Sequence, residues 1–277
     1  MPSDSSIANV DEADSLARPS GSTQTIRCAA ELEFIPQRLA YRLAADVAYP
    51  NDGELLLWRC RSEWHFVSKD AAYARLSQAE LARVKSHPNP ALGKRFVVGR
   101  AAMREILGDM IGCAPTEVDL VEDAQGQLRV ANVGEREPIE IAIAYAGIWI
   151  VIGVSKSPLG LATSVPTLPD NAASGHPDGD TASSRRQKMS RSIETRSHVR
   201  HASLTYAMGV QLMNADAHHV PQQDAATFFV DAPDARRWQI IDLPMPGIIS
   251  AAAAVAQPVT RVHAFGWMGR DGRAIAE

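Results

Sequence analysis

The sequence lacks an excess of basic charge, a long hydrophobic run and a paired set of cysteines, and each absence excludes a class of protein. The formal net charge of -4 over 277 residues argues against a strongly basic nucleic-acid-binding protein. No run of about 18 apolar residues is present, so we expect no membrane-spanning helix. The three cysteines are odd in number and show no C-x-x-C spacing, which favours a reducing, cytoplasmic compartment.

The composition that remains is that of a globular protein. Hydrophobic residues make up 45% of the chain and charged residues 22%, which allows a sizeable core. Residues 1–26 contain many Ser and Asp residues and no apolar segment, so we predict a disordered tail rather than a secretory signal. Residues 269–277 are predicted to fray as a second tail.

Residue patterns predict two strands and two helices in the first part of the chain. Glu54–Cys60 and Trp64–Val67 are expected to be strands. A Ser-x-x-Glu motif that begins at Ser77 predicts a capping box and a short helix. Apolar residues recur at helical spacing over Lys94–Ile111, which predicts a long helix that ends at Gly112.

A strand hairpin is predicted at the centre of the chain. Ile139, Ile141 and Ile143 alternate with small or polar residues, which is the period of a half-buried strand. Gly147 marks a turn, and the apolar, β-branched segment Ile148–Val154 predicts a second, largely buried strand.

The rest of the chain is predicted to contain a linker, a helix and three strands. Residues 166–192 are rich in Pro, Gly, Asp and Ser and are interpreted as a flexible linker with a basic end. A helix is predicted over His198–Leu212. The predicted strands are Phe228–Asp231, Trp238–Leu243 and Ile248–Val255, although the alanines of the last are also compatible with a buried helix.

The central hairpin resembles that of the surfactin-type 4′-phosphopantetheinyl transferases, which move the phosphopantetheine arm of coenzyme A onto a serine of a carrier protein. Their hairpin reads S-H-S-G, then an apolar strand, then G-x-D-x-E. The same frame fits this chain without a gap, as Ala144–Gly147, Ile148–Val154 and Gly160–Ser164.

The resemblance implies candidate binding residues in the first lobe. Arg95, Phe96, Arg100 and Arg104 match the family's R-F-x-x-x-R-x-x-x-R helix. The two later arginines are interpreted either as contacts to coenzyme or to the other lobe, or as a solvated helix face. Gln127 stands where family members often carry a lysine near the coenzyme phosphates.

The residues that carry the family's chemistry are replaced. Ala144 and Tyr145 stand in place of its Ser-His pair, although the Tyr145 hydroxyl could still donate one hydrogen bond. Ala162 and Ser164 replace the metal-binding Asp and Glu of the hairpin. When the second helix is aligned on Gly209, the substituted positions are His198, His201, Ala202 (for the third metal-binding carboxylate) and Tyr206.

The loss of these carboxylates argues against magnesium chemistry. Magnesium prefers oxygen ligands, and removing a positioned electrostatic group from a transition state typically costs a factor of about 100 to 1000. We therefore expect no metal site and no resident cofactor, with coenzyme A as the remaining candidate ligand. His198 and His201 could face one metal on a helix, but no third ligand stands out.

The resemblance implies an α/β (α+β) fold of two similar lobes that form a pseudo-dimer. Each lobe would be a small antiparallel sheet packed on a long helix, with coenzyme in the cleft between the lobes. The implied boundaries are 27–165 for the N-terminal lobe, 166–192 for the linker and 193–268 for the C-terminal lobe.

Two hypotheses of function follow, and the sequence leaves open whether the chain is an enzyme. The first is a degenerate transferase-like protein without magnesium-dependent transfer. It would act as the partner of an acyl or peptidyl carrier protein, or as a repurposed enzyme, in a polyketide or nonribosomal peptide pathway. The second is an active transferase with substituted ligands. A repurposed enzyme would use an apolar pocket lined by Ala144, Tyr145, Ala162 and Ala202.

A basic run in the linker is the candidate docking surface for a carrier protein. Clustered positive charge would speed the encounter with an acidic partner, and the alternative is an ordinary solvated face. The residues of this run are Arg185, Arg186, Lys188 and Arg191. We expect a monomer that binds neither nucleic acid nor membrane.

Overall fold

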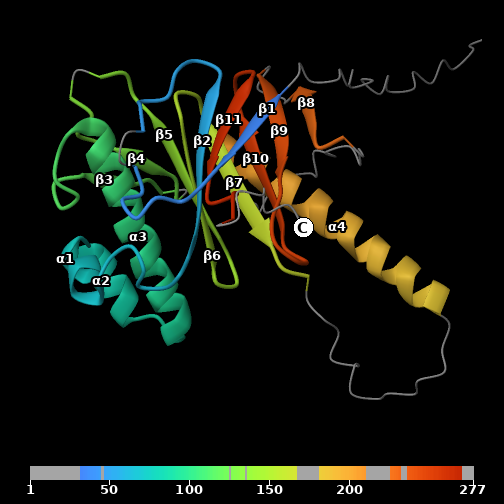
Figure 1. Ribbon diagram of the computed structural model, residues 1–277, viewed down its shortest axis with the longest axis horizontal. Helices are drawn as coiled ribbons and strands as arrows, with labels where there is room; N and C mark the ends of the chain where they lie inside the picture. The colour runs from blue at the N-terminus through green and yellow to red at the C-terminus, as the bar shows by residue number, and fades with distance from the viewer. Residues whose placement is uncertain are drawn as a thin grey trace, which may run out of the picture.

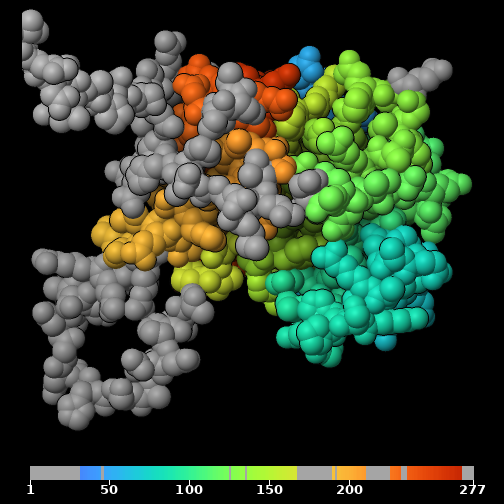
Figure 2. Space-filling view, turned by 180° about the vertical axis from the view of Figure 1, so that it is seen from behind, coloured from blue at the N-terminus to red at the C-terminus, as the bar shows by residue number. Residues whose placement is uncertain are grey.

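A computed structural model describes residues 32–44, 47–124, 126–134, 136–166, 181–209, 225–231 and 236–269. Within these ranges the chain has a mixed α+β fold with two sheets and four helices. The helices are α1 (Lys69–Ala74), α2 (Gln78–Lys85), α3 (Pro90–Ile111) and α4 (Thr181–Met208). Figure 1 shows α3 and α4 on opposite sides of the strands. In the view from behind, the α1–α3 helices gather on the side away from α4 (Figure 2). No helix within the described ranges is long and apolar enough to cross a membrane.

The larger sheet has seven strands. Their spatial order is β1 (Glu33–Gln37), β11 (Arg261–Phe265), β2 (Glu54–Arg61), β6 (Trp149–Ser155), β5 (Glu140–Ala146), β4 (Leu128–Val130) and β3 (Leu120–Glu122). β11 runs parallel to both β1 and β2, and the remaining neighbours are antiparallel.

The smaller sheet has four antiparallel strands. Their order is β7 (Leu159–Ser164), β10 (Ser250–Val255), β9 (Arg237–Leu243) and β8 (Thr227–Asp231). β10 confirms the strand interpretation of the alanine-rich segment. Its alanines are buried on both faces, because α4 covers one face and the larger sheet covers the other.

The two sheets and the two long helices stack as four layers. Alternation along β2 shows the order: Leu56 and Trp58 face α3, whereas Leu55 and Leu57 face the smaller sheet. On the far face of the smaller sheet, Leu204 of α4 packs against buried residues of β8 and β9. Each sheet is therefore covered by one long helix and by the other sheet.

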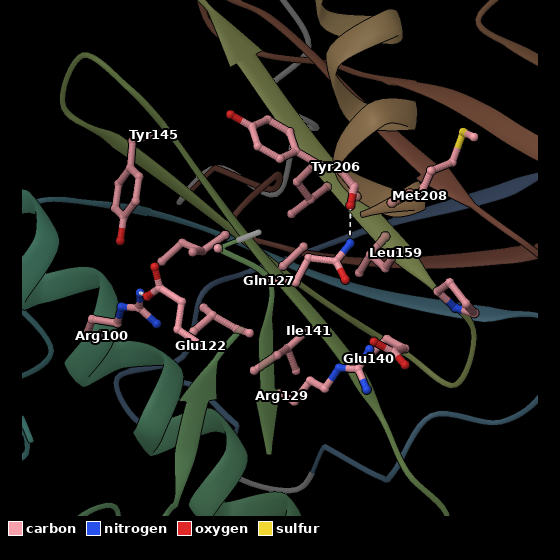
Figure 3. Close-up of a pocket in the computed structure, with 18 of the residues that line it drawn as sticks. Arg100, Glu122, Gln127, Arg129, Glu140, Ile141, Tyr145, Leu159, Tyr206 and Met208 are labelled. Atoms are coloured by element: carbon pink, nitrogen blue, oxygen red, sulfur yellow. Dashed lines mark hydrogen bonds and ion pairs between the residues drawn. The ribbon is translucent and has the colours of Figure 1, made fainter. Parts of the chain in front are cut away.

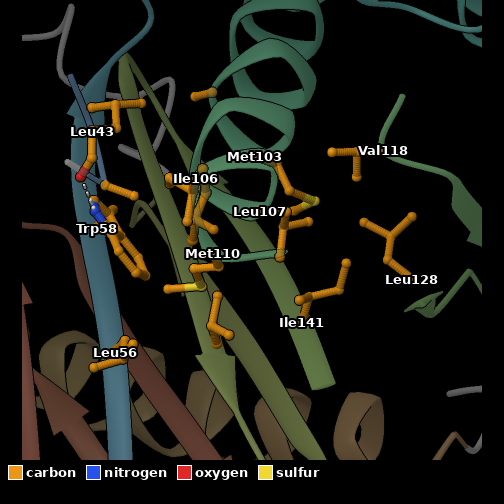
Figure 4. Close-up of a cluster of buried hydrophobic side chains, with 14 of the residues drawn as sticks. Leu43, Leu56, Trp58, Met103, Ile106, Leu107, Met110, Val118, Leu128 and Ile141 are labelled. Carbon is orange, nitrogen blue, oxygen red and sulfur yellow. Dashed lines mark hydrogen bonds between the residues drawn. The ribbon is translucent and has the colours of Figure 1, made fainter. Parts of the chain in front are cut away.

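The helix α3 is positioned by its ends and by its buried face. The Asn89 side chain caps the first turn and Pro90 occupies the first helical position. Gly112 ends the helix at a φ of 78°, which a glycine adopts at low cost. Figure 4 shows Met103 and Ile106 over the larger sheet, and burial of each such side chain contributes about 1.5–3 kcal/mol.

Several predicted elements are confirmed. The central hairpin forms as β5, a turn and β6, and the capping box at Ser77 opens α2. β2, β8, β9 and β10 also form where strands were expected.

The predicted strand at Trp64–Val67 is wrong. These residues form turns and bends before α1, and Trp64 and Val67 pack against the helices. The neighbouring strand β2 already has β11 on one side and β6 on the other, so the sheet offers no free edge there.

The predicted linker is also wrong at its C-terminal end. The helix α4 begins at Thr181, so residues 181–192 belong to a helix, and residues 167–180 lie outside the described ranges. The predicted tails, 1–26 and 269–277, also lie outside them, apart from residue 269.

The predicted lobe boundaries do not coincide with the sheets. β7 belongs to the predicted N-terminal lobe but pairs with β10 in the smaller sheet. β11 belongs to the predicted C-terminal lobe but lies between β1 and β2 in the larger sheet. The larger sheet is consequently not purely antiparallel, contrary to expectation.

Candidate functional site

A cavity of about 430 Å³ lies where α3, the β3–β4 turn, β5, the start of β7 and the end of α4 meet. Three of the residues predicted to bind a ligand line this cavity, namely Arg100, Gln127 and Tyr145 (Figure 3). Tyr206 of α4 also lines it. Segments that are far apart in the sequence therefore converge on one cavity.

Arg104 does not join this cavity. Its side chain is buried, and Nη2 lies 2.8 Å from Oε2 of Glu80, the residue that closes the capping box of α2. Arg104 therefore holds α2 against α3, and neither predicted role, ligand contact or solvated face, applies to it.

Tyr145 is placed by the alternation of β5 and by a glycine of α3. Its ring lies against Gly99, where an added Cβ would be only 2.7 Å from the phenol oxygen. The hydroxyl is buried and has no hydrogen-bond partner among the described residues. Burial raises the pKa of Tyr145 to about 12, although Arg100, Arg95 and Arg83 act to lower it. At neutral pH the phenol is therefore an unused, uncharged donor.

Arg100 is held in a network of charges next to Tyr145. Its Nη2 lies 2.6 Å from Oε2 of Glu122, and its Nε lies 3.6 Å from Oε1 of Glu80. That Nε is buried and lacks a hydrogen-bond partner within the described part of the chain. Arg83 also binds Glu122, at 3.1 Å. The Glu122 carboxylate on β3 thus forms ion pairs with two guanidinium groups at the cavity wall.

Gln127 connects the first half of the chain to α4. The turn before it has Gly126 at a φ of 82°, and the backbone NH of Gln127 donates to Asp123 Oδ1 at 2.9 Å. The Gln127 side chain donates through Nε2 to the carbonyl of Tyr206 in the last turn of α4. Gln127 therefore satisfies a helix-end carbonyl at the rim of the cavity, where the resemblance implies a lysine.

Formal charge around the cavity is mostly positive. Four arginines and two glutamates line it: Arg83, Arg100, Arg129, Arg236, Glu122 and Glu140. An excess of guanidinium groups over carboxylates favours anionic ligands.

Two of the three positions at which the resemblance implies metal ligands lie in a separate, apolar site. Ala162 of β7 and Ala202 of α4 lie buried in one small cluster with Val199 and Ala252. Ser164 lies at the end of β7, half-buried and opposite Ser250. The structure therefore brings Ala162 and Ala202 together, as the alignment on Gly209 implies, but neither offers a ligand atom for magnesium.

Gly160 explains how α4 comes so close to β7. A Cβ at this position would overlap the carbonyl oxygen of Ser203. In the resemblance, Gly160 and Ser203 are two of the positions that match the family motifs. Both lie at the closest contact between the strand and the helix.

The predicted apolar pocket of four residues does not form. Ala144 and Tyr145 are neighbours on a strand and point to opposite faces: Ala144 packs between the sheets, and Tyr145 faces α3. Ala162 and Ala202 belong to a third environment beneath α4. The expectation failed because it grouped residues by motif and not by strand face.

The remaining candidates give no metal site within the described ranges. No three His, Cys, Asp or Glu side chains gather there in a way that could hold an ion. His198 is exposed and His201 is half-buried on α4. The side chains of Arg185, Arg186, Lys188 and Arg191 lie outside the described residues, although their backbone belongs to α4.

Neither models of known protein families nor curated proteins gave a match to this chain.

Sequence reasoning missed Glu122 and Gly99. Glu122 lies on a three-residue edge strand with no pattern of its own. Gly99 did leave a signal, because a glycine inside a long helix costs about 1 kcal/mol relative to alanine and usually has a packing reason.

Proposed function

We propose that this chain is a degenerate relative of the surfactin-type phosphopantetheinyl transferases that does not perform magnesium-dependent transfer. It would act as a partner of an acyl or peptidyl carrier protein in a polyketide or nonribosomal peptide pathway. The observation that carries this proposal is that Ala162 and Ala202, at two of the three positions where the resemblance implies carboxylates, are packed in an apolar cluster with Val199 and Ala252.

The physical argument is that this cluster cannot hold a divalent cation. Alanine offers no ligand atom, and burying a cation without anionic partners costs several kcal/mol. The residues present do not fit magnesium, so no step of the reaction is assigned to it. Each sheet is covered by one long helix, which agrees with one feature of the implied lobes, whereas the exchange of β7 and β11 between the sheets does not.

The test is a transfer assay on a carrier protein. Purified chain is mixed with apo carrier protein, coenzyme A and magnesium, and the carrier is weighed by mass spectrometry. We expect no gain of the phosphopantetheine mass, whereas an active family member run in parallel should modify the carrier fully. Transfer at a normal turnover rate would sink the proposal.

An active transferase with substituted ligands is the second candidate, and the excess of arginines around the cavity favours it. Titration calorimetry with coenzyme A separates the two. Micromolar binding that requires magnesium would support the active transferase, and magnesium-independent binding or no binding would support the degenerate protein.

The proposed partner surface has its own test. A variant with Arg185, Arg186 and Lys188 changed to Glu should bind an acidic carrier protein more weakly, with most of the loss in the association rate and at low salt. Equal association rates for the variant and the parent would remove this surface from the proposal.

A further inference from the structure

We propose that the cavity contains an oxyanion-binding subsite in which the chain's own Glu122 occupies the place of the ligand. A phosphoryl or carboxylate group would displace the Glu122 carboxylate from Arg100 and Arg83 and accept a hydrogen bond from Tyr145. This inference concerns the same cavity as the proposed function but requires neither a carrier protein nor magnesium.

The geometry of Glu122 is that of a bound carboxylate ligand. Its Oε2 lies 2.6 Å from Arg100 Nη2, and its Oε1 lies 3.1 Å from Arg83 Nη1. The side chain is 37% exposed, whereas that of Arg100 is only 6% exposed. Glu122 is therefore the solvent-facing member of the ion pair, and its displacement would leave Arg100 Nη2 free to bind another anion.

The strand that carries Glu122 is suited to movement. β3 has three residues and lies at the edge of the larger sheet, where it pairs only with β4. An edge strand of this length is held by few backbone hydrogen bonds, so a side-chain rearrangement there disturbs little else.

Two buried donors next to Glu122 lack acceptors. The Tyr145 hydroxyl and the Arg100 Nε have no hydrogen-bond partner among the described residues. Figure 3 shows the Tyr145 hydroxyl pointing toward Arg100 and Glu122. Leaving a buried polar group unsatisfied is unfavourable, so an arriving acceptor oxygen would recover part of that cost.

The charge around the phenol favours an anion over a neutral acceptor. The Arg95 guanidinium lies 5.2 Å from the centre of the Tyr145 ring and donates to the Gly147 carbonyl. Arg83 and Arg100 line this end of the cavity, and all three guanidinium groups lie close enough to Tyr145 to favour negative charge there. A ligand with two or more negative charges would therefore compete well with a single carboxylate.

The experiment is a calorimetric titration of the full-length protein with inorganic pyrophosphate, and separately with malonate, in EDTA at low ionic strength. Glu122→Gln removes the competing charge and should tighten binding roughly tenfold. Tyr145→Phe removes one hydrogen bond to a charged ligand and should weaken binding roughly ten- to hundredfold. Circular dichroism and thermal melts establish that each variant is folded.

The matched control is Glu140→Gln, because Glu140 also lines the cavity and carries the same charge. It should change affinity less than about threefold, since the carboxylate that pairs with Arg100 and Arg83 is that of Glu122 and not that of Glu140. Binding of pyrophosphate alone assigns the subsite to phosphoryl groups, and binding of malonate alone assigns it to carboxylates.

Three results would overturn the inference. They are equal tightening by Glu122→Gln and Glu140→Gln, unchanged affinity in Tyr145→Phe, and no binding of either anion to any variant. Transfer of phosphopantetheine in the carrier assay would contradict the proposed function. It would not affect the outcome of these titrations, which contain neither carrier protein nor magnesium.

Discussion

Single residues in this protein are positioned by small neighbours. The phenol of Tyr145 can lie against α3 because Gly99 has no side chain. The buried Arg200, in contrast, is held by Asp242, with Nε and Nη2 at 2.8 Å and 2.6 Å from the two carboxylate oxygens. This ion pair anchors α4 on β9.

Gly99→Ala should destabilise the protein by about 1–3 kcal/mol, because the new Cβ would lie 2.7 Å from the Tyr145 oxygen and 2.9 Å from Ile143 Cδ1. The control is Gly93→Ala on the same helix, where the nearest atom is 3.8 Å away. That change should be neutral or should stabilise by up to about 1 kcal/mol. Urea denaturation of both variants measures the difference, and equal effects would contradict the packing argument.

Tyr145 should also give the protein an alkaline pH dependence. Burial raises its pKa from an ordinary value of 10.0 to about 12. A raised folded pKa means that the associated stability is complete below pH 10 and is lost as the pH rises through 12.

Comparison with Tyr145→Phe isolates this effect, because other groups titrate alike in both proteins. The stability of the parent relative to the variant should fall by at most about 3 kcal/mol between pH 10 and 12. A constant difference over that range, measured by denaturation at each pH, would show that the phenol is not buried in solution.

At the scale of elements, the contact between β7 and α4 determines how α4 packs on the smaller sheet. Gly160 permits this contact, and Ala162 and Ala202 fill the space beside it with small apolar side chains. Larger or charged residues there would separate the helix from the sheet.

Gly160→Ala should therefore cost more than about 3 kcal/mol, since the obstacle is the backbone of Ser203 and not a flexible side chain. Hydrogen exchange in α4 should accelerate relative to α3. The control Ser164→Ala, at the half-buried end of the same strand, should change stability by less than about 0.5 kcal/mol. Unchanged protection of α4 in Gly160→Ala would refute the close contact.

At the scale of the whole molecule, the two sheets are built from exchanged strands. β7 belongs to the first half of the chain but is a strand of the smaller sheet. β11 lies near the end of the chain but is placed between β1 and β2 in the larger sheet. Neither half can complete its own sheet.

A fragment of residues 1–165 should therefore fail to fold alone, because β2 loses β11 and β7 loses β10. Circular dichroism and size-exclusion chromatography should show an unfolded or aggregated species. The full chain should unfold in one cooperative transition over the described elements. A soluble, folded fragment would show that the halves are independent.

The helix predicted over Lys94–Ile111 lacked the first turn of α3, which begins at Pro90. The sequence by itself determined these local features: the hairpin of β5 and β6, the end of α3 and the capping box of α2. Each of these depends on neighbours within a few residues, through periodicity, capping or a turn glycine.

Only the tertiary structure decided the pairing of β1, β11 and β2, the early start of α4 and the meeting of Glu122 with Arg100 and Arg83. These depend on contacts between residues far apart in the chain, and one sequence carries no local pattern for them. The burial of Tyr145 is a further example. The hairpin pattern predicted its place on a strand, but its burial depends on contact with Gly99 of α3.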